Sequence, residues 1–216
     1  MILPLSAQIH EFGFGGGSAT LISDLGTDSF YLPDGYFVTA LYRGNTNEWI
    51  SFRINLSYAR VTEADSLSES EGRRLRNWNA NTDIVDLNVM IEYNFLPTNP
   101  YRIPHGVWVT PYIAGGLGVY GSFLHITAPN KDPIDHNENS AFIPLAFGVK
   151  FIFRNRMKLV FEIRPQYSLK DNLEGSLIMD SKELPHTNQL SNDWFIYNGI
   201  TLTFGWGKLP CYLNIF

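Results

Sequence analysis

The chain alternates apolar and polar side chains over long stretches. Between residues 49 and 61, apolar side chains recur at every second position with polar or small ones between them, and residues 85–95 repeat this pattern. A β-strand points successive side chains to opposite faces, so each stretch predicts a strand with one apolar face and one polar face. Each stretch also has about the 9–11 residues that a tilted strand needs to cross a bilayer. The repetition of the pattern along the chain favours a membrane β-barrel.

Eight strands are expected within a single all-β domain. The facing of the second of them is not settled by its pattern, because nearly all of its side chains are apolar. Three prolines, Pro111, Pro144 and Pro165, interrupt the later strands, and in a barrel they are expected at bulges or near the rims. The predicted ranges are 9–19, 36–43, 49–61, 85–95, 107–120, 141–153, 158–169 and 193–204.

The connections between these strands alternate in length. Short links are expected at 44–48, 96–105 and 154–157, and long polar links at 21–35, 62–82, 123–140 and 170–192. Outer-membrane barrels have short periplasmic turns and longer extracellular loops. The chain is therefore predicted to be an eight-stranded antiparallel transmembrane β-barrel of the Gram-negative outer membrane. With an even number of strands, both termini are expected on the periplasmic side.

The polar face of the strands carries charges that a narrow barrel would enclose. Opposite charges there are expected to form a network of salt bridges and hydrogen bonds, because an unpaired buried charge is costly. The competing interpretation is a soluble β-sandwich whose polar face is wet. Aromatic side chains near strand ends, at Tyr93, Phe95, Phe153, Trp194 and Phe204, fit the girdles of a membrane barrel. The predicted lumen network consists of Glu11, Arg53, Asp86, Glu92, Lys150, Glu162 and Arg164.

Composition narrows the function classes further. The formal net charge of −5 is mild and the basic residues are scattered, so no nucleic-acid partner is expected. Residues 1–7 are interpreted as the end of a signal peptide, with cleavage before Gln8, although an ordinary first strand is the alternative. The barrel is assigned to residues 8–205 and a periplasmic tail to residues 206–216. Cys211 is the one cysteine, so an internal disulfide is impossible.

No catalytic or cofactor motif emerges from the chain. The five histidines lack the spacing of metal ligands, four of them fall in predicted loops or turns, and there is no Gly-x-Ser-x-Gly elbow. We therefore expect no cofactor, no metal site and no enzymatic activity. Some small outer-membrane barrels modify lipids, and in that case the residue to examine is a histidine near the outer rim, His125 or His186.

Several motifs, taken in order along the chain, resemble PorG-type proteins, which are small outer-membrane barrels of the type IX secretion system in Bacteroidota. The similar stretches are EFGFGGGS at 11–18 with ISDLG at 22–26, DNLEG at 171–175, DWF at 193–195, GITLTFG at 199–205 and PCY at 210–212. The chain departs from that pattern at 206–208, where Trp-Gly-Lys stands in place of a basic residue directly after the glycine.

The resemblance implies a non-catalytic part that anchors or assembles a periplasmic ring at the outer membrane. Its expected partners are outer-membrane lipid, a periplasmic ring lipoprotein and the partner subunit of that lipoprotein. The tail residues Lys208, Pro210, Cys211 and Tyr212 are the expected contacts. Cys211 would form an intermolecular disulfide or remain a buried or free thiol, and both alternatives stay open. A general surface barrel acting in adhesion or stress resistance through its external loops is the alternative function.

Overall fold

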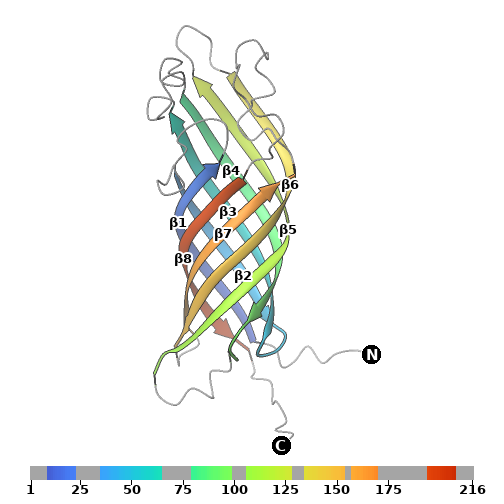
Figure 1. Cartoon of the computed structure of the whole chain (residues 1–216), viewed down its shortest axis with the longest axis vertical. Coiled ribbons are helices and arrows are strands. Elements are labelled where there is room, and N and C mark those ends of the chain that lie inside the picture. The colour runs from blue at the N-terminus through green and yellow to red at the C-terminus, as the bar shows by residue number, and fades with distance from the viewer. Residues whose placement is uncertain are drawn as a thin grey trace, which may run out of the picture.

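The computed structural model is a closed β-barrel, and it describes residues 9–22, 35–64, 79–98, 106–127, 134–153, 157–169 and 194–207. Each strand pairs antiparallel with the next one in the chain, and β1 pairs with β8 to close the barrel (Figure 1). The predicted fold class is confirmed. The strands are β1 (Ile9–Ile22), β2 (Gly35–Asn45), β3 (Ile50–Ala64), β4 (Asn79–Asn94), β5 (Trp108–Thr127), β6 (Ile134–Ile152), β7 (Met157–Ser168) and β8 (Trp194–Trp206).

Among the described residues, no helix has the length and apolarity that a membrane crossing requires.

Several strands extend well beyond their predicted bounds at the end of the barrel opposite to the start of β1. The sequence predicts loops at 62–82 and 123–140, but residues 62–64, 79–82, 123–127 and 134–140 belong to strands. These extensions pair with one another, as at Asn79↔Thr127 and Ile126↔Ile134. The alternation that marks the lower strands is weak there, because above a membrane both faces of a strand can be polar. The wall formed by β3 to β6 therefore rises higher than β1, β7 and β8 (Figure 1).

Pro144 and Pro165 lie at gaps in the hydrogen-bond ladder but create no bulges, whereas Pro111 pairs with Val149. Between β5 and β6, the pairs Gly115↔Leu145 and Gly118↔Phe142 flank a gap of equal length on both strands, and Pro144 lies in that gap. The β6–β7 ladder has a similar gap at Pro165. The expectation of bulges or rim positions is therefore wrong for these two prolines. Proline removes a donor, but the inward and outward faces still fix the register.

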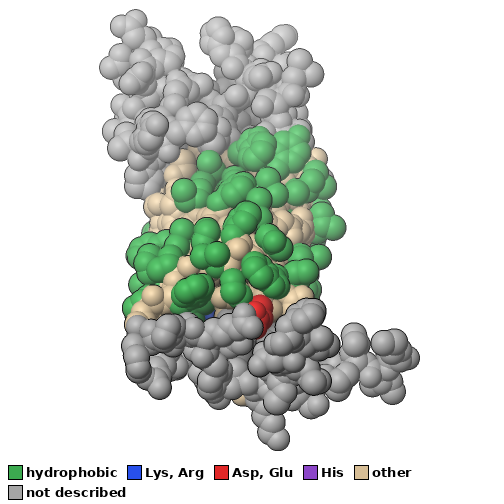
Figure 2. All heavy atoms as spheres, turned by 60° about the horizontal axis from the view of Figure 1, so that its bottom comes forward, with side chains coloured by type: hydrophobic (Ala, Val, Ile, Leu, Met, Phe, Trp, Pro, Cys, Tyr) green, Lys and Arg blue, Asp and Glu red, His purple; other side chains and the backbone are tan. Residues whose placement is uncertain are grey.

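The outward face of the barrel is an apolar belt. Large apolar side chains on it are highly exposed, with Ile91 at 65% and Leu117 at 69%, and they cover the wall between the two ends of the barrel (Figure 2). A soluble monomer rarely exposes a contiguous apolar surface of this extent. The belt is thus a lipid-facing surface, and the soluble β-sandwich is excluded. Of the predicted girdle residues, Tyr93, Phe95, Trp194 and Phe204 are exposed and Phe153 is partly exposed.

Candidate functional site: the charged lumen

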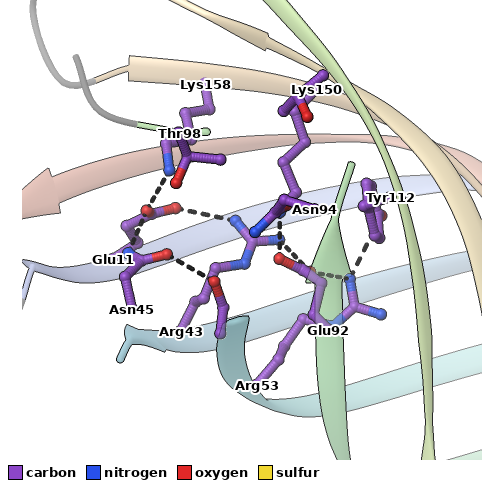
Figure 3. Close-up of polar contacts among 12 residues, drawn as sticks. Glu11, Arg43, Asn45, Arg53, Glu92, Asn94, Thr98, Tyr112, Lys150 and Lys158 are labelled. Carbon is purple, nitrogen blue, oxygen red and sulfur yellow. Dashed lines mark hydrogen bonds and ion pairs between the residues drawn. The ribbon is translucent and has the colours of Figure 1, made fainter. Parts of the chain in front are cut away.

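The polar face of each strand turns inward, and all seven predicted lumen residues lie there. Six of them are buried, and the side chain of Glu162 is 14% exposed. Six of the seven, Glu11, Arg53, Glu92, Lys150, Glu162 and Arg164, belong to one connected network, which extends toward the end of the barrel at which β1 begins. Figure 3 shows the part of it around Glu11 and Glu92.

The centre of this network is the Glu92 carboxylate on β4. Its Oε2 lies 3.2 Å from Arg43 Nη2 and 3.6 Å from Arg53 Nη1, and its Oε1 accepts a hydrogen bond from Lys150 Nζ (Figure 3). Lys150 also donates to Asn94 Oδ1 at 2.5 Å. One carboxylate therefore compensates cations from three different strands.

A second carboxylate, Glu11 on β1, closes the lower end of the network. Arg43 Nη1 donates to Glu11 Oε2 at 2.9 Å, and Lys158 Nζ donates to Glu11 Oε1 at 2.5 Å. Asn45 Nδ2 adds a bond of 2.6 Å to Oε1, and Thr203 Oγ1 on β8 adds one of 3.3 Å to Oε2. Arg43 thus bridges the two carboxylates, because its other nitrogen faces Glu92.

The third carboxylate, Glu162 on β7, accepts hydrogen bonds from Arg53 and Tyr112. Arg53 Nη1 lies 2.5 Å from Glu162 Oε2, and the Tyr112 hydroxyl donates to the same oxygen. Lys150 Nζ lies 4.4 Å from the centroid of the Tyr112 ring, within the range of a cation–π contact. With Glu162 included, every strand of the barrel contributes at least one side chain. The network therefore links all eight strands through the interior of the barrel.

Tyr112→Phe tests the contribution of this hydroxyl. The variant keeps the ring that Lys150 contacts but leaves the largely buried Glu162 carboxylate with one donor fewer. We expect the free energy of unfolding to fall by about 1–2 kcal/mol, measured by urea titration of the barrel refolded in lipid vesicles. Tyr93→Phe, on the exposed outer face, is the matched control and should change that free energy by less than about 0.5 kcal/mol. Equal effects of the two substitutions would contradict the assignment.

Asp86 lies outside this network, and Arg164 joins it only through Glu162, whose Oε1 lies 3.9 Å from Arg164 Nε. Asp86 accepts hydrogen bonds from neutral donors, Asn88 Nδ2 at 2.9 Å and Tyr197 Oη at 3.2 Å. The Arg164 guanidinium lies 5.1 Å from the ring centroid of Tyr197 and donates to Ser57 Oγ at 3.1 Å. Their environment is a layer of hydroxyl, amide and aromatic groups.

Two basic residues of the lumen, Arg43 and Lys158, are absent from the predicted network. Both have a usable signal in the sequence: Arg43 shares its face of β2 with Thr39, and Lys158 shares its face of β7 with Glu162. The signal is weak for Arg43 because its strand is mostly apolar, and for Lys158 because it stands at the start of its strand. Together with the seven predicted residues, these two give four acids against five bases, namely Glu11, Asp86, Glu92 and Glu162 against Arg43, Arg53, Lys150, Lys158 and Arg164.

The upper half of the lumen is apolar, which the charged residues of the polar face did not predict. Phe37 and Tyr197 stack there with ring centroids 4.6 Å apart. The inward face of a strand can be apolar as long as it is filled, because a narrow barrel packs its interior with side chains. The buried cluster consists of Ala19, Leu21, Phe37, Ala59, Val61, Ile84, Tyr120, Phe142, Phe195 and Tyr197.

The remaining sequence predictions concern residues outside the charged lumen. Lys208, Pro210, Cys211 and Tyr212 lie outside the described residues, as do the signal-peptide remnant at 1–7 and the DNLEG stretch. His125 and His136 were expected in a loop but lie on the extended parts of β5 and β6, whereas His186 is outside the described part. Within that part, no group of three or more His, Cys, Asp or Glu side chains is arranged to hold a metal ion.

The profile of the family described as a domain of unknown function (DUF6089) matches residues 1–214. The chain belongs to this family. No curated protein matches the sequence.

Solved structures show which barrels this DUF6089 chain is similar to. Neisserial surface protein A (NspA) is 12% identical with a TM-score of 0.53, over 92% of this chain and 97% of that chain. A major outer membrane protein from Thermus thermophilus is also 12% identical with a TM-score of 0.53, over 93% of this chain and 100% of that chain. At this level of identity the likeness shows the fold alone. The DUF6089 chain is a small β-barrel of the outer-membrane kind.

Proposed function

We propose that this protein is a non-catalytic barrel of the Gram-negative outer membrane that anchors or assembles a periplasmic ring of a type IX secretion machine. The observation that carries the proposal is that side chains fill the described part of the lumen. Buried ion pairs fill its lower half and packed aromatic side chains fill its upper half. Such an interior suits a rigid anchor whose specific contacts lie on its rims, and the PorG-like motifs select the ring as the partner.

The arrangement of the strands supports a periplasmic position for both termini of the chain. β1 begins and β8 ends at the lower end of the barrel, where the link between β2 and β3 is only residues 46–49 (Figure 1). Short turns face the periplasm in outer-membrane barrels. Both termini are then periplasmic, and the tail residues Lys208, Pro210, Cys211 and Tyr212, which follow β8 in the sequence, are the proposed contacts with the ring lipoprotein and its partner subunit.

Deletion of residues 208–216 tests the proposal. β8 ends at Trp206, so the last strand is intact in this variant and the barrel should still fold. We expect the ring lipoprotein to be lost from pull-downs of the barrel and secretion of effectors to fall at least about tenfold, since the tail is proposed to provide the main contact. The control replaces residues 128–133, the link between β5 and β6, with a Gly/Ser segment. Full secretion after deletion of the tail would overturn the proposal.

The taller wall favours a second candidate, a surface barrel that binds through its extracellular end. β3 to β6 extend beyond their neighbours on the side of the long links, as a platform for external contacts would. NspA, which has the same fold, is a surface protein by its name. If replacement of residues 128–133 abolishes function and deletion of the tail does not, this second candidate is the correct one.

A further inference from the structure

The apolar belt is interrupted at one place on the outer face. Between the two aromatic girdles, the described outward positions carry apolar side chains or glycine except for Ser18, Thr20 and Asn198. Ser18 and Asn198 are direct cross-strand partners on β1 and β8, and Thr20, which is buried, is the next outward position of β1. Ser18 and Asn198 therefore form one polar patch at the seam where the barrel closes.

This patch lies well inside the lipid-facing region. Asn198 follows Trp194 of the upper girdle by four residues and precedes Trp206 at the lower end by eight. With about 3.3 Å of rise per residue and a strand tilt of about 40°, Asn198 lies roughly 10 Å below the level of Trp194. At that depth there is no water to satisfy an amide, and polar groups facing lipid are rare and costly.

The amide of Asn198 has no hydrogen-bond partner among the described residues. Ser18 Oγ lies 3.5 Å from the Asn198 backbone oxygen, and the side chain of Asn198 remains partly exposed. Its two donors and its acceptor thus point toward the membrane. A polar group in that position is best satisfied by another protein surface in the same plane.

We propose that the seam of β1 and β8 is the interface of a homodimer, with Asn198 of one copy hydrogen-bonded to Asn198 of the other. Two copies in one membrane share the same orientation, so a two-fold axis between them runs along the membrane normal. Each residue near that axis then meets its own counterpart at the same depth. A carboxamide both donates and accepts, so it is complementary to itself.

The surroundings of Asn198 allow the two walls to approach. Gly16, next to Ser18 on the same face of β1, has no side chain, and small residues let backbones come close within a membrane. Exposed apolar side chains surround Gly16 and Asn198, namely Val38 on β2, Ile163 on β7 and Ile200 on β8. These side chains would pack around the central pair of amides.

Disulfide cross-linking tests the contact directly. The full-length chain with Cys211→Ser is the background, so that a single engineered thiol is present. Asn198→Cys, oxidised with copper phenanthroline in phosphatidylcholine vesicles, should give a band at twice the monomer mass on a non-reducing gel. Leu87→Cys is the matched control, because Leu87 faces lipid on β4 and follows Asp83 of the polar rim by four residues. It should remain monomeric.

A second variant measures how much the Asn198 amide contributes to self-association. Asn198→Leu should weaken self-association in detergent micelles by about 3- to 30-fold, measured by sedimentation, which is the range for a hydrogen bond between membrane segments. Leu87→Ala should leave association unchanged, and circular dichroism checks that both variants are folded. The proposal is overturned if the two cysteine variants cross-link equally or not at all, if a different protein is captured in native membranes, or if Asn198→Leu associates normally.

Discussion

Replacing Glu92 with Gln is expected to lower the free energy of unfolding of this barrel by about 3–5 kcal/mol, the cost of breaking a buried ion pair by removing one partner. Arg43 and Arg53 are direct cross-strand neighbours on β2 and β3, so two like charges stand side by side in the lumen. Both lie within 3.6 Å of Glu92 Oε2, and Lys150 contacts its other oxygen. Without that negative charge, the three buried cations repel one another.

Urea titration of the refolded barrel in lipid vesicles measures this effect. Asp83→Asn is the matched control, because it neutralises a carboxylate that pairs with Arg60 at 3.6 Å while both side chains are well exposed, at 34% and 50%. A surface pair of this kind should be worth less than about 1 kcal/mol. If Glu92→Gln were no more destabilising than Asp83→Asn, the buried charges of the lumen would not stabilise the barrel as proposed.

A double variant distinguishes loss of charge balance from loss of packing. In Glu92→Gln with Lys150→Met, the anion and one of its cations are removed together, and a side chain of similar length fills the space. Replacing both partners of a buried pair is often nearly neutral. We therefore expect the double variant to recover part of the stability that the single variant loses. A further loss would show that Lys150 acts mainly through Asn94 and the Tyr112 ring.

The strands and their facing could be predicted because a lipid-facing strand alternates strictly. Most of residues 49–61 and 85–95 lie between lipid and the polar part of the lumen, so every second side chain is constrained, and that constraint predicts β3 and β4. The extensions at 79–82 and 123–127 carry no such signal, because their outer faces are not required to be apolar. Their strand structure comes from pairing with each other, which a single sequence does not reveal.

The composition of the lumen could be predicted but its pairings could not. Alternation places Glu92 and Arg53 on inward faces, and their charges predict that they have partners. Which cation meets Glu92 depends on the curvature of the barrel wall, since Arg43 on β2 reaches Glu92 past β3, from a strand that does not pair with β4. By hydrogen-bond register alone, Arg43 has two direct neighbours, Glu11 on β1 and Arg53 on β3, so the register does not reveal its contact with Glu92.

Gly116→Ala is expected to destabilise the barrel by about 3 kcal/mol, near the upper end of the usual cost of overpacking. Gly116 on β5 faces the lumen opposite Met90 on β4. A Cβ atom at Gly116 would lie 1.9 Å from the Val89 carbonyl oxygen and 2.8 Å from Met90 Cα. Both of these are backbone atoms, so no side-chain rotation relieves the clash and the two strands would have to separate.

The preceding residue provides the control. Gly115 faces the lipid, and a Cβ atom there would meet only Leu145 Cδ2 at 3.4 Å, an ordinary contact. Gly115→Ala should therefore change the free energy of unfolding by less than about 1 kcal/mol, with either sign. Equal losses from the two substitutions would assign the effect to the strand propensity of glycine. A loss confined to Gly116→Ala would show that the close approach of β4 and β5 excludes any side chain at position 116. Since Glu92 is the next inward residue after Met90 on β4, that approach also helps to hold this carboxylate against its three cations.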